Sequence, residues 1–224
     1  MNREELISEY KKLSMNVKEK KMEILKQLDE NKELIVSDNI IRDSNLCIFL
    51  SCPGEDELIE DCVCFGETGK NLEDILNIIK DKIPDIKSGT SSRNGNRYKY
   101  SIINSSNIVH FRAYNNAEPN ATEIKNNVDN VIKELKSISE LKYIIVAGDK
   151  AEYLYKQVVK KYVGILSIKY STICHLGNIG IRNEYKNNYR INDTTILEDL
   201  NEEERDQKRK ELLADRIVKE LKTE

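Results

Sequence analysis

The sequence predicts an α/β fold: a three-layer α/β/α sandwich around a central four-stranded, mostly parallel sheet, with helical extensions at both ends of the chain. Two patterns indicate this class. Short apolar runs bounded by Gly, Pro, Asn or Ser are typical of strands buried in a parallel sheet. Longer segments between them repeat apolar residues every three or four positions, as amphipathic helices do. Because strands and helices alternate, helices are expected on both faces of the sheet.

The first part of the chain, residues 1–40, is expected to be a helical extension, because apolar residues at helical spacing indicate two helices there. The first strand is expected at 46–50 (LCIFL), and the turn at Pro53-Gly54 follows it. After an acidic loop, an amphipathic helix is expected to begin within the Gly-Glu-Thr-Gly segment at 66–69.

The middle of the chain continues the alternation. A segment rich in Gly, Ser, Asn and basic residues predicts an exposed loop at 83–98. The next expected elements are a strand at 101–109, a helix capped by Asn120 or Thr122, a strand at 143–147 and a helix at 151–161.

The last predicted strand is at 165–174, and a Gly-containing loop at 176–180 follows it. A charged amphipathic helix is expected at 201–222. The α/β domain should therefore cover 41–190, and 191–224 should form a charged helical segment that packs on it.

The chain has 224 residues, which suits one α/β domain with extensions. Its formal net charge of −3 argues mildly against a nucleic-acid partner, but the acidic excess lies at the two ends, and residues 41–190 hold 21 basic and 19 acidic side chains. The chain shows neither an apolar signal segment nor an apolar run long enough to cross a bilayer. We therefore expect a cytoplasmic monomer with no membrane partner.

Five cysteines are present, and none belongs to a C-x-x-C pair, so neither a disulfide framework nor the usual zinc spacing is predicted. Most of them are expected to be reduced core residues. Cys62, Cys64, Cys174 and His175 remain an alternative metal-binding set, for which a C-x-C spacing is a weak signal.

Polar residues follow three of the predicted strands. Three acidic residues at 55–57 follow the first strand, Asn107 lies near the end of the second, and His175 follows the last. The carboxyl ends of parallel strands meet at one edge of a sheet, where ligands of α/β proteins bind. Each residue alone is commonly a turn or structural residue, but their joint placement predicts a functional site.

Four segments of the chain resemble motifs of one family, the uracil-DNA glycosylase superfamily, and are most similar to its bacterial and archaeal branch, family four. The resemblance covers about residues 45 to 183 in the family's order. The matching segments are Pro53-Gly54 with the acidic cluster and the Gly66-to-Gly69 helix start, Asn107 to Arg112 with Pro119 to Glu123, IIVAGDKA at 144–151, and His175-Leu176-Gly177.

The resemblance implies a DNA glycosylase, which flips a base out of DNA and hydrolyses its N-glycosidic bond. It implies that His175 donates a hydrogen bond to the departing base, that Asn107 reads the base edge, and that Glu57 stabilises the sugar cation or orients water. The remaining residues implied in substrate binding are Pro53, Gly54, Glu55, Cys64, Phe65, Leu176 and Arg182, with Leu176 or Ile179 as the wedge that fills the opened strand.

The chain also departs from the family. Family-four enzymes hold a [4Fe-4S] cluster with four cysteines, but Phe111 stands at one of these positions and the N-terminal C-x-x-C is missing, so we expect no cluster, metal or other cofactor. Cys64 falls where the family has a stacking aromatic residue, so either Phe65 replaces it or the pocket is remodelled for another base. Leu176 replaces the proline that follows the family's histidine.

Three other functions remain open from the sequence. The protein could bind DNA or a base without turnover, or it could excise a bulkier modified base. A nucleotide-binding α/β protein with a phosphate loop at Gly148 is the third alternative, which has no Gly-rich fingerprint or Walker lysine to support it.

Overall fold

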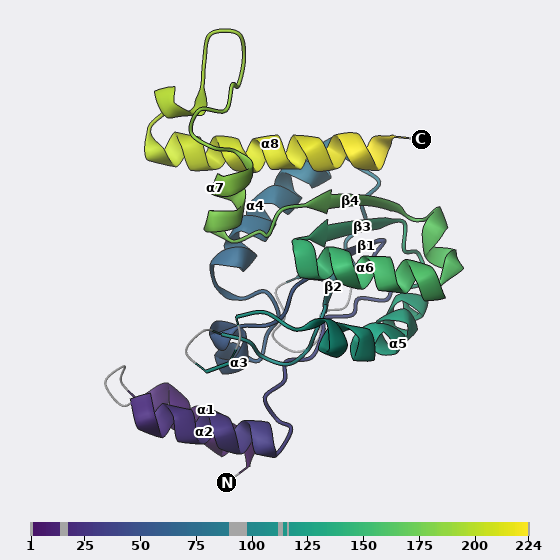
Figure 1. Ribbon diagram of the computed structural model, residues 1–224. Coiled ribbons are helices and arrows are strands. Elements are labelled where there is room, and N and C mark those ends of the chain that lie inside the picture. The colour runs from purple at the N-terminus through teal and green to yellow at the C-terminus, as the bar shows by residue number, and fades with distance from the viewer. Residues whose placement is uncertain (1, 14–17, 90–97, 112–113, 116, 224) are drawn as a thin grey trace.

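The computed structural model describes residues 2–13, 18–89, 98–111, 114–115 and 117–223. A four-stranded, all-parallel sheet forms its centre, with the strand order β2-β1-β3-β4 (Figure 1). The strands are β1 (Leu46–Leu50), β2 (Ser101–Asn104), β3 (Tyr143–Ala147) and β4 (Lys169–Ile173). Both central strands, β1 and β3, are buried along their whole length. This burial explains their continuous apolar sequences, because helices cover both of their faces.

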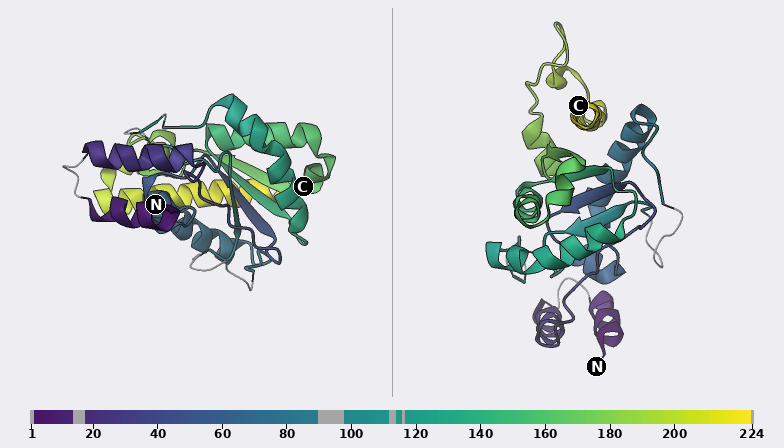
Figure 2. Two further views of the ribbon diagram at one scale, coloured as in Figure 1. Left: turned by 90° about the horizontal axis from the view of Figure 1, so that it is seen from below. Right: turned by 90° about the vertical axis from the view of Figure 1, so that its right-hand side faces the viewer.

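Each face of the sheet has its own apolar core. Leu46, Ile48 and Leu50 belong to the core that includes α4 (Gly66–Lys82) and α8 (Glu202–Lys222). Cys47 and Phe49 point the other way, into the core formed with α5 (Ala121–Ser137) and α6 (Asp149–Lys161). Figure 2 shows these helices on the two sides of the sheet. The predicted α/β/α sandwich is therefore confirmed.

The two N-terminal helices, α1 (Arg3–Lys12) and α2 (Lys18–Glu30), lie on the side of the molecule away from α8 (Figures 1 and 2). The Tyr10 hydroxyl donates a hydrogen bond to Oε1 of Glu55 at 2.6 Å. This bond fastens α1 to α3 (Glu55–Glu60), the short helix that follows β1.

The segment that follows α2 runs beside the edge strand β2. Isolated antiparallel bridges join Ile35 to Ile108 and Asn39 to Ile102. Asn39 is fully buried and donates its side-chain amide to the carbonyl oxygens of Tyr98 and Tyr100. These contacts cover the β2 edge, which would otherwise expose backbone hydrogen-bonding groups.

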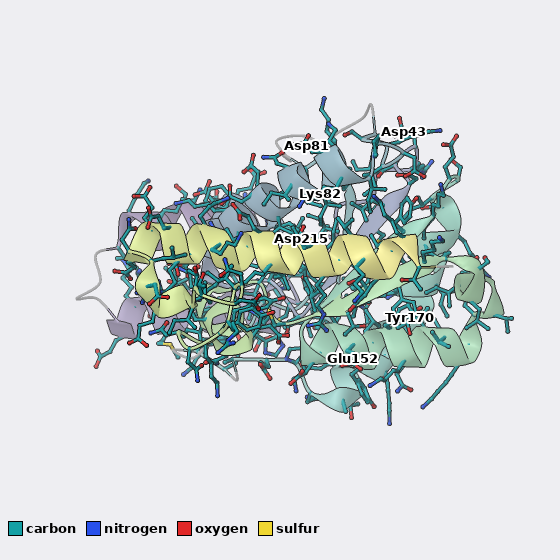
Figure 3. The ribbon with its side chains drawn as sticks, turned by 90° about the horizontal axis from the view of Figure 1, so that it is seen from above. Asp43, Asp81, Lys82, Glu152, Tyr170 and Asp215 are labelled. Carbon is teal, nitrogen blue, oxygen red and sulfur yellow. The ribbon has the colours of Figure 1, made fainter. Side chains whose placement is uncertain are left out.

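The C-terminal helix α8 lies across α4 and the opposite edge strand, β4 (Figure 3). Ion pairs join Lys82 of α4 to Asp215, and Lys210 to Asp74 of α4 at 2.6 Å. On the β4 side, Nη2 of Arg216 donates to the Thr172 carbonyl oxygen at 3.0 Å. Along the chain, the helix α7 (Asn178–Glu184) and the short 3-10 helix η2 (Leu197–Asp199) come between β4 and α8.

Three element boundaries differ from the prediction. The acidic residues after β1 form the helix α3 rather than a loop, and β2 ends at Asn104 rather than near residue 109. Residues 163–167 form a 3-10 helix, η1 (Val163–Ser167), so β4 begins only at Lys169. Most of the loop predicted at 83–98 lies outside the described residues, since 90–97 are not among them. None of the described helices is long and apolar enough to cross a bilayer.

Candidate functional site

A cavity of about 500 Å³ opens at the carboxyl edge of the sheet. Its walls come from the loop after β1, from Glu57 in α3, from the end of β2 at Asn104, and from His175 together with the helix α7 (Asn178–Glu184). These segments are far apart in the sequence, and the parallel sheet brings them together. The cavity therefore lies where the polar strand ends predicted a site.

Glu57 is the first of the predicted catalytic residues in this cavity. It is the third residue of α3, and its Oε2 accepts a hydrogen bond from the Gly54 backbone N–H at 2.9 Å. Burial raises the pKa of Glu57, while this N–H partly offsets the increase. The same bond caps the helix, so Glu57 has a structural role whether or not it takes part in chemistry.

His175, the second predicted catalytic residue, lies in the cavity wall just beyond β4. The Gly177 backbone N–H donates to its Nδ1 at 3.0 Å. An accepting Nδ1 places the proton of the neutral imidazole on Nε2. Partial burial lowers the pKa of His175, although the residue stays exposed at the mouth of the cavity. The neutral ring is therefore favoured, with Nε2–H as its donor.

The backbone around His175 leaves no space for a side chain at one position. A Cβ added to Gly180 would lie 2.1 Å from the His175 carbonyl oxygen. Only glycine, which has no Cβ, can occupy this position of α7 so close to the His175 carbonyl oxygen.

The loop after His175 is fastened to the start of α4. The buried Asn71 amide donates to the Leu176 carbonyl oxygen at 2.9 Å and to Oδ1 of Asn178 at 2.8 Å. The Asn178 amide in turn donates to the Glu67 carboxylate. These bonds fix the backbone on the carboxyl side of His175.

The expectation that Leu176 is a wedge is not met, because its side chain is only 1% exposed and belongs to the core. Ile179, the alternative, is 78% exposed and lies at the cavity. The Asn71 amide holds the Leu176 backbone against α4, and the Leu176 side chain packs in the core on that face of the sheet.

Asn107, the third predicted catalytic residue, does not reach this cavity. It lines a separate hollow of about 550 Å³ with Lys133 and Glu134 of α5. In the orientation that satisfies its side-chain amide, Asn107 donates to both carboxylate oxygens of Asp38, at 3.0 and 3.1 Å. The chain leaves the sheet before residue 107, since the Ser105 backbone N–H donates to the Leu50 and Ser51 carbonyl oxygens. Asn104, the last residue of β2, lines the cavity instead of Asn107.

The predicted substrate-binding residues divide into two groups. Pro53, Gly54 and Cys64 line the cavity. Glu55 does not, because it is the acceptor for Tyr10. Phe65 is 38% exposed at the start of α4 and is not part of the cavity wall, so Cys64 alone occupies the place expected for a stacking ring.

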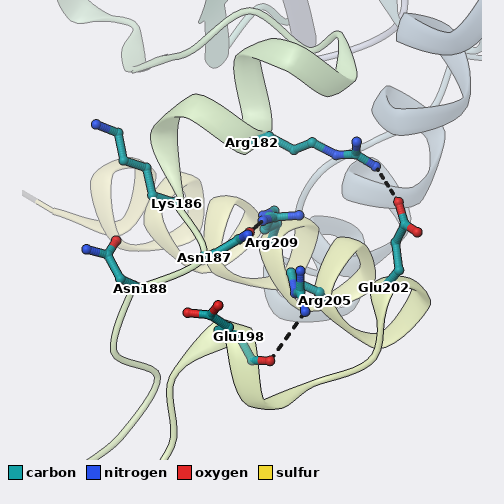
Figure 4. Close-up of a pocket in the computed structure, with 8 residues that line it drawn as sticks. All are labelled: Arg182, Lys186, Asn187, Asn188, Glu198, Glu202, Arg205 and Arg209. Atoms are coloured by element: carbon teal, nitrogen blue, oxygen red, sulfur yellow. Dashed lines mark hydrogen bonds and ion pairs between the residues drawn. The ribbon is translucent and has the colours of Figure 1, made fainter.

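Arg182, which the resemblance implies in substrate binding, is not part of the cavity wall. It forms ion pairs with Asp206 at 2.7 Å and with Glu202 at 3.5 Å. Its surroundings are a second pocket between α7 and α8, where Arg205 and Arg209 also bond to protein carbonyl or carboxylate oxygens (Figure 4). Residue 112, the arginine in the second matching segment, lies outside the described residues.

Three further residues, Asn104, His110 and Glu118, line the cavity although the sequence did not predict them as site residues. Asn104 and His110 bracket the end of the second predicted strand, so the signal was present, but the wrong polar residue was chosen. The His110 backbone N–H donates to the Pro53 carbonyl oxygen at 2.9 Å, and its imidazole lies 3.6 Å from Glu123. A further hollow of about 440 Å³ shares Ser51, Glu118, His175, Gly180 and Asn183 with the cavity, so the site continues toward the start of α6.

The cysteines do not assemble into a metal site. Among the described residues, no group of three or more His, Cys, Asp or Glu side chains could hold a metal ion. Burial raises the pKa of Cys52 and of Cys174 to about 11, so both thiols stay protonated near neutral pH.

Comparison with known proteins identifies no family for this chain. No family model matches the chain, and no curated protein matches it.

Proposed function

We propose that this protein is a monofunctional DNA glycosylase, which hydrolyses the N-glycosidic bond of uracil or of another modified base flipped out of DNA. One observation carries the proposal: Glu57 and His175, from the ends of different strands, line one cavity together with an amide side chain, that of Asn104. The resemblance of the surrounding segments to the uracil-DNA glycosylase superfamily supports it.

His175 supplies the donor that the departing base needs. Cleavage of the glycosidic bond leaves negative charge on the base, and a neutral imidazole with its proton on Nε2 donates to a base oxygen without giving up that proton. The Gly177 N–H to Nδ1 bond holds the ring in this state. A donor directed at a developing negative charge contributes about 2.7–4 kcal/mol in comparable sites.

Glu57 acts on the sugar side of the same bond. The positive charge that builds on the sugar attracts the Glu57 carboxylate, or the carboxylate orients the attacking water. Its fixed position at the start of α3, through the Gly54 bond, reduces the cost of ordering this group.

Asn104 takes the base-reading role that the sequence assigned to Asn107. An amide offers one acceptor and two donor hydrogens, which suits the edge of a uracil ring. Asn104 is 2% exposed and lies in the cavity wall, so a base that enters would meet it in a water-poor environment.

Ile179 is the wedge in this proposal. A large apolar side chain that is mostly exposed beside a cavity can enter the space that a flipped base leaves in the stack. Flipping costs a few kcal/mol, and a wedge stabilises the opened strand against return of the base.

One observation favours a second candidate, a base-binding protein of the same fold without turnover. Cys64 lines the cavity and Phe65 does not, so the described cavity residues offer no phenyl ring on which the base could stack. Such a protein would bind base-modified DNA and release no base.

A single-turnover assay separates the two candidates. Oligonucleotides that carry uracil, hypoxanthine or a modified cytosine are incubated with excess protein, and alkali-labile abasic sites are measured. The glycosylase proposal predicts abasic product from at least one base and a loss of about 10²–10³-fold in His175→Ala. Saturable binding of the same oligonucleotides without abasic product would support the second candidate.

A further inference from the structure

The Asn104 amide is held from outside the cavity by Asp38, a residue of the segment that covers the β2 edge. Oδ1 of Asp38 accepts the Asn104 backbone N–H at 2.8 Å and the Asn104 side-chain Nδ2 at 3.3 Å. Asp38 is itself 4% exposed and does not line the cavity. Asp38 therefore lies behind Asn104, which itself lines the cavity.

Asp38 is surrounded by groups that make it an acceptor. Besides the two Asn104 donors, the Asn107 side-chain amide points at both of its oxygens. Burial raises the pKa of Asp38 well above that of an ordinary aspartate and the nearby Glu134 of α5 adds to the increase, whereas the N–H groups of Asn104 and Asn107 oppose it. The oxygens that face Asn104 and Asn107 nevertheless accept from N–H groups in this arrangement.

This arrangement fixes which way the Asn104 amide faces. Oδ1 of Asp38 already accepts the Asn104 backbone N–H, so it presents an acceptor to the side-chain amide, whose NH₂ end turns to Asp38. No donor among the described residues reaches Oδ1 of Asn104. The amide oxygen is therefore the group that is available to a base in the cavity.

We propose that Asp38 is a positioning residue that sets base selectivity, by holding Asn104 with its amide oxygen toward the cavity. This inference rests on the proposed glycosylase function and narrows its substrate class. The amide oxygen accepts from a ring N–H, which uracil offers at N3 and hypoxanthine at N1. Cytosine presents a lone pair at N3, so the same orientation excludes it.

Asp38→Asn tests the role directly. A new amide at position 38 can donate to Oδ1 of Asn104, which lets Asn104 turn its own NH₂ toward the cavity and donate to N3 of cytosine. We expect the ratio of single-turnover rates for uracil over cytosine, in otherwise identical single-stranded oligonucleotides, to fall at least about 10-fold.

Asn127→Ala is the matched control. Asn127 donates to the backbone carbonyl oxygens of Asn104 and Ser105, at 3.2 and 3.3 Å, and does not touch the Asn104 amide. Its loss loosens the same strand end without changing what the amide presents. The uracil-to-cytosine ratio of this variant should stay within about 2-fold of the wild type, even if both rates fall.

A spectroscopic measurement tests the arrangement without relying on activity. In ¹⁵N-labelled wild-type protein, one side-chain proton of Asn104, assigned by its absence in Asn104→Asp, should exchange with solvent at least about 10-fold more slowly than the amide of exposed Asn77. Exchange at the Asn77 rate overturns the proposal, and this result needs no variant of Asp38 that folds.

The remaining outcomes are distinct. A folded Asp38→Asn protein with an unchanged uracil-to-cytosine ratio overturns the role of Asp38 and leaves the glycosylase function intact. A wild-type protein that releases no base from any oligonucleotide overturns both proposals. A shifted ratio in Asp38→Asn with an unchanged ratio in Asn127→Ala supports the inference.

Discussion

The backbone N–H of Gly177 donates to Nδ1 of His175 at 3.0 Å, and this contact decides which nitrogen of the imidazole carries the proton. The histidine can then act toward the cavity only as an Nε2–H donor while it is neutral. The surrounding protein lowers its pKa, so the neutral state persists below the pH at which an ordinary histidine becomes charged.

The dependence of excision on pH follows from two shifts. The active form in our account has neutral His175 and ionised Glu57. Burial lowers the pKa of His175, so His175 becomes neutral at a lower pH than an ordinary histidine, and it raises the pKa of Glu57, so Glu57 ionises at a higher pH than an ordinary glutamate. The single-turnover rate should therefore rise with pH through the acidic range and level off near neutral pH. A rate that falls over this range would require a protonated His175 and would contradict the proposed state.

Gly180→Ala should disturb His175 more than Gly177→Ala does. A Cβ at 180 would lie 2.1 Å from the His175 carbonyl oxygen, which the backbone can relieve only by moving. A Cβ at 177 would lie 3.1 Å from Nδ1, which a small shift accommodates. We expect Gly180→Ala to lose at least about 2 kcal/mol of unfolding free energy, and Gly177→Ala less than about 1. Chemical denaturation measures both, and the reverse order would refute the packing argument.

Asn71→Leu removes the amide that holds the loop after His175. The Leu176 carbonyl oxygen then lacks its side-chain donor in a buried position, which costs about 1–3 kcal/mol of unfolding free energy. Residues 175–180 should also exchange their backbone hydrogens faster, as hydrogen–deuterium exchange can show. Asn77→Leu, on the exposed side of the same helix, is the control and should change neither quantity appreciably.

Ile179→Ala should affect duplex DNA more than single-stranded DNA. A wedge is needed only where a base must be held out of a stack, so we expect roughly a 10-fold loss of rate on a duplex substrate and little change on a single strand. Leu166→Ala, which shortens another exposed apolar side chain far from the cavity, serves as the control. Equal losses on both substrates would remove Ile179 from the wedge role.

The sheet could be predicted because its two central strands carry the signal in their own residues. LCIFL and YIIVA are continuous apolar runs, which burial on both faces of a parallel sheet requires. The amphipathic helices were predictable for the same reason, since each has one apolar side that packs on a sheet face.

The end of β2 could not be predicted from the residues around it. The apolar residues Ile108 and Val109 continue the strand pattern in the sequence, but their partners are in the N-terminal segment: Ile108 bridges to Ile35, and the Val109 N–H donates to the Leu34 carbonyl oxygen. The turn at Ser105 depends on the carbonyl oxygens of Leu50 and Ser51. Both features are tertiary contacts, and the choice of Asn107 over Asn104 failed for this reason.

The candidate site was predictable only where its residues follow directly from the strand order. Glu57 and His175 follow predicted strands directly, so the topology alone places them at one edge. The Leu176 backbone is held by Asn71, far away in the sequence, and Arg182 is held by Asp206 in α8. Interactions of this kind leave no periodic pattern in the sequence.

The central claim is that the Glu57 carboxylate acts on a substrate in the cavity, beyond its capping of α3. The most direct test compares Glu57→Gln with Glu60→Gln, an exposed glutamate of the same helix that lies 3.7 Å from Lys11. Single-turnover release of the base by wild-type protein, lowered about 10²–10⁴-fold in Glu57→Gln and unchanged in Glu60→Gln, is the result we predict. Equal rates in folded wild-type and Glu57→Gln protein, or no base release by the wild type, would contradict the account.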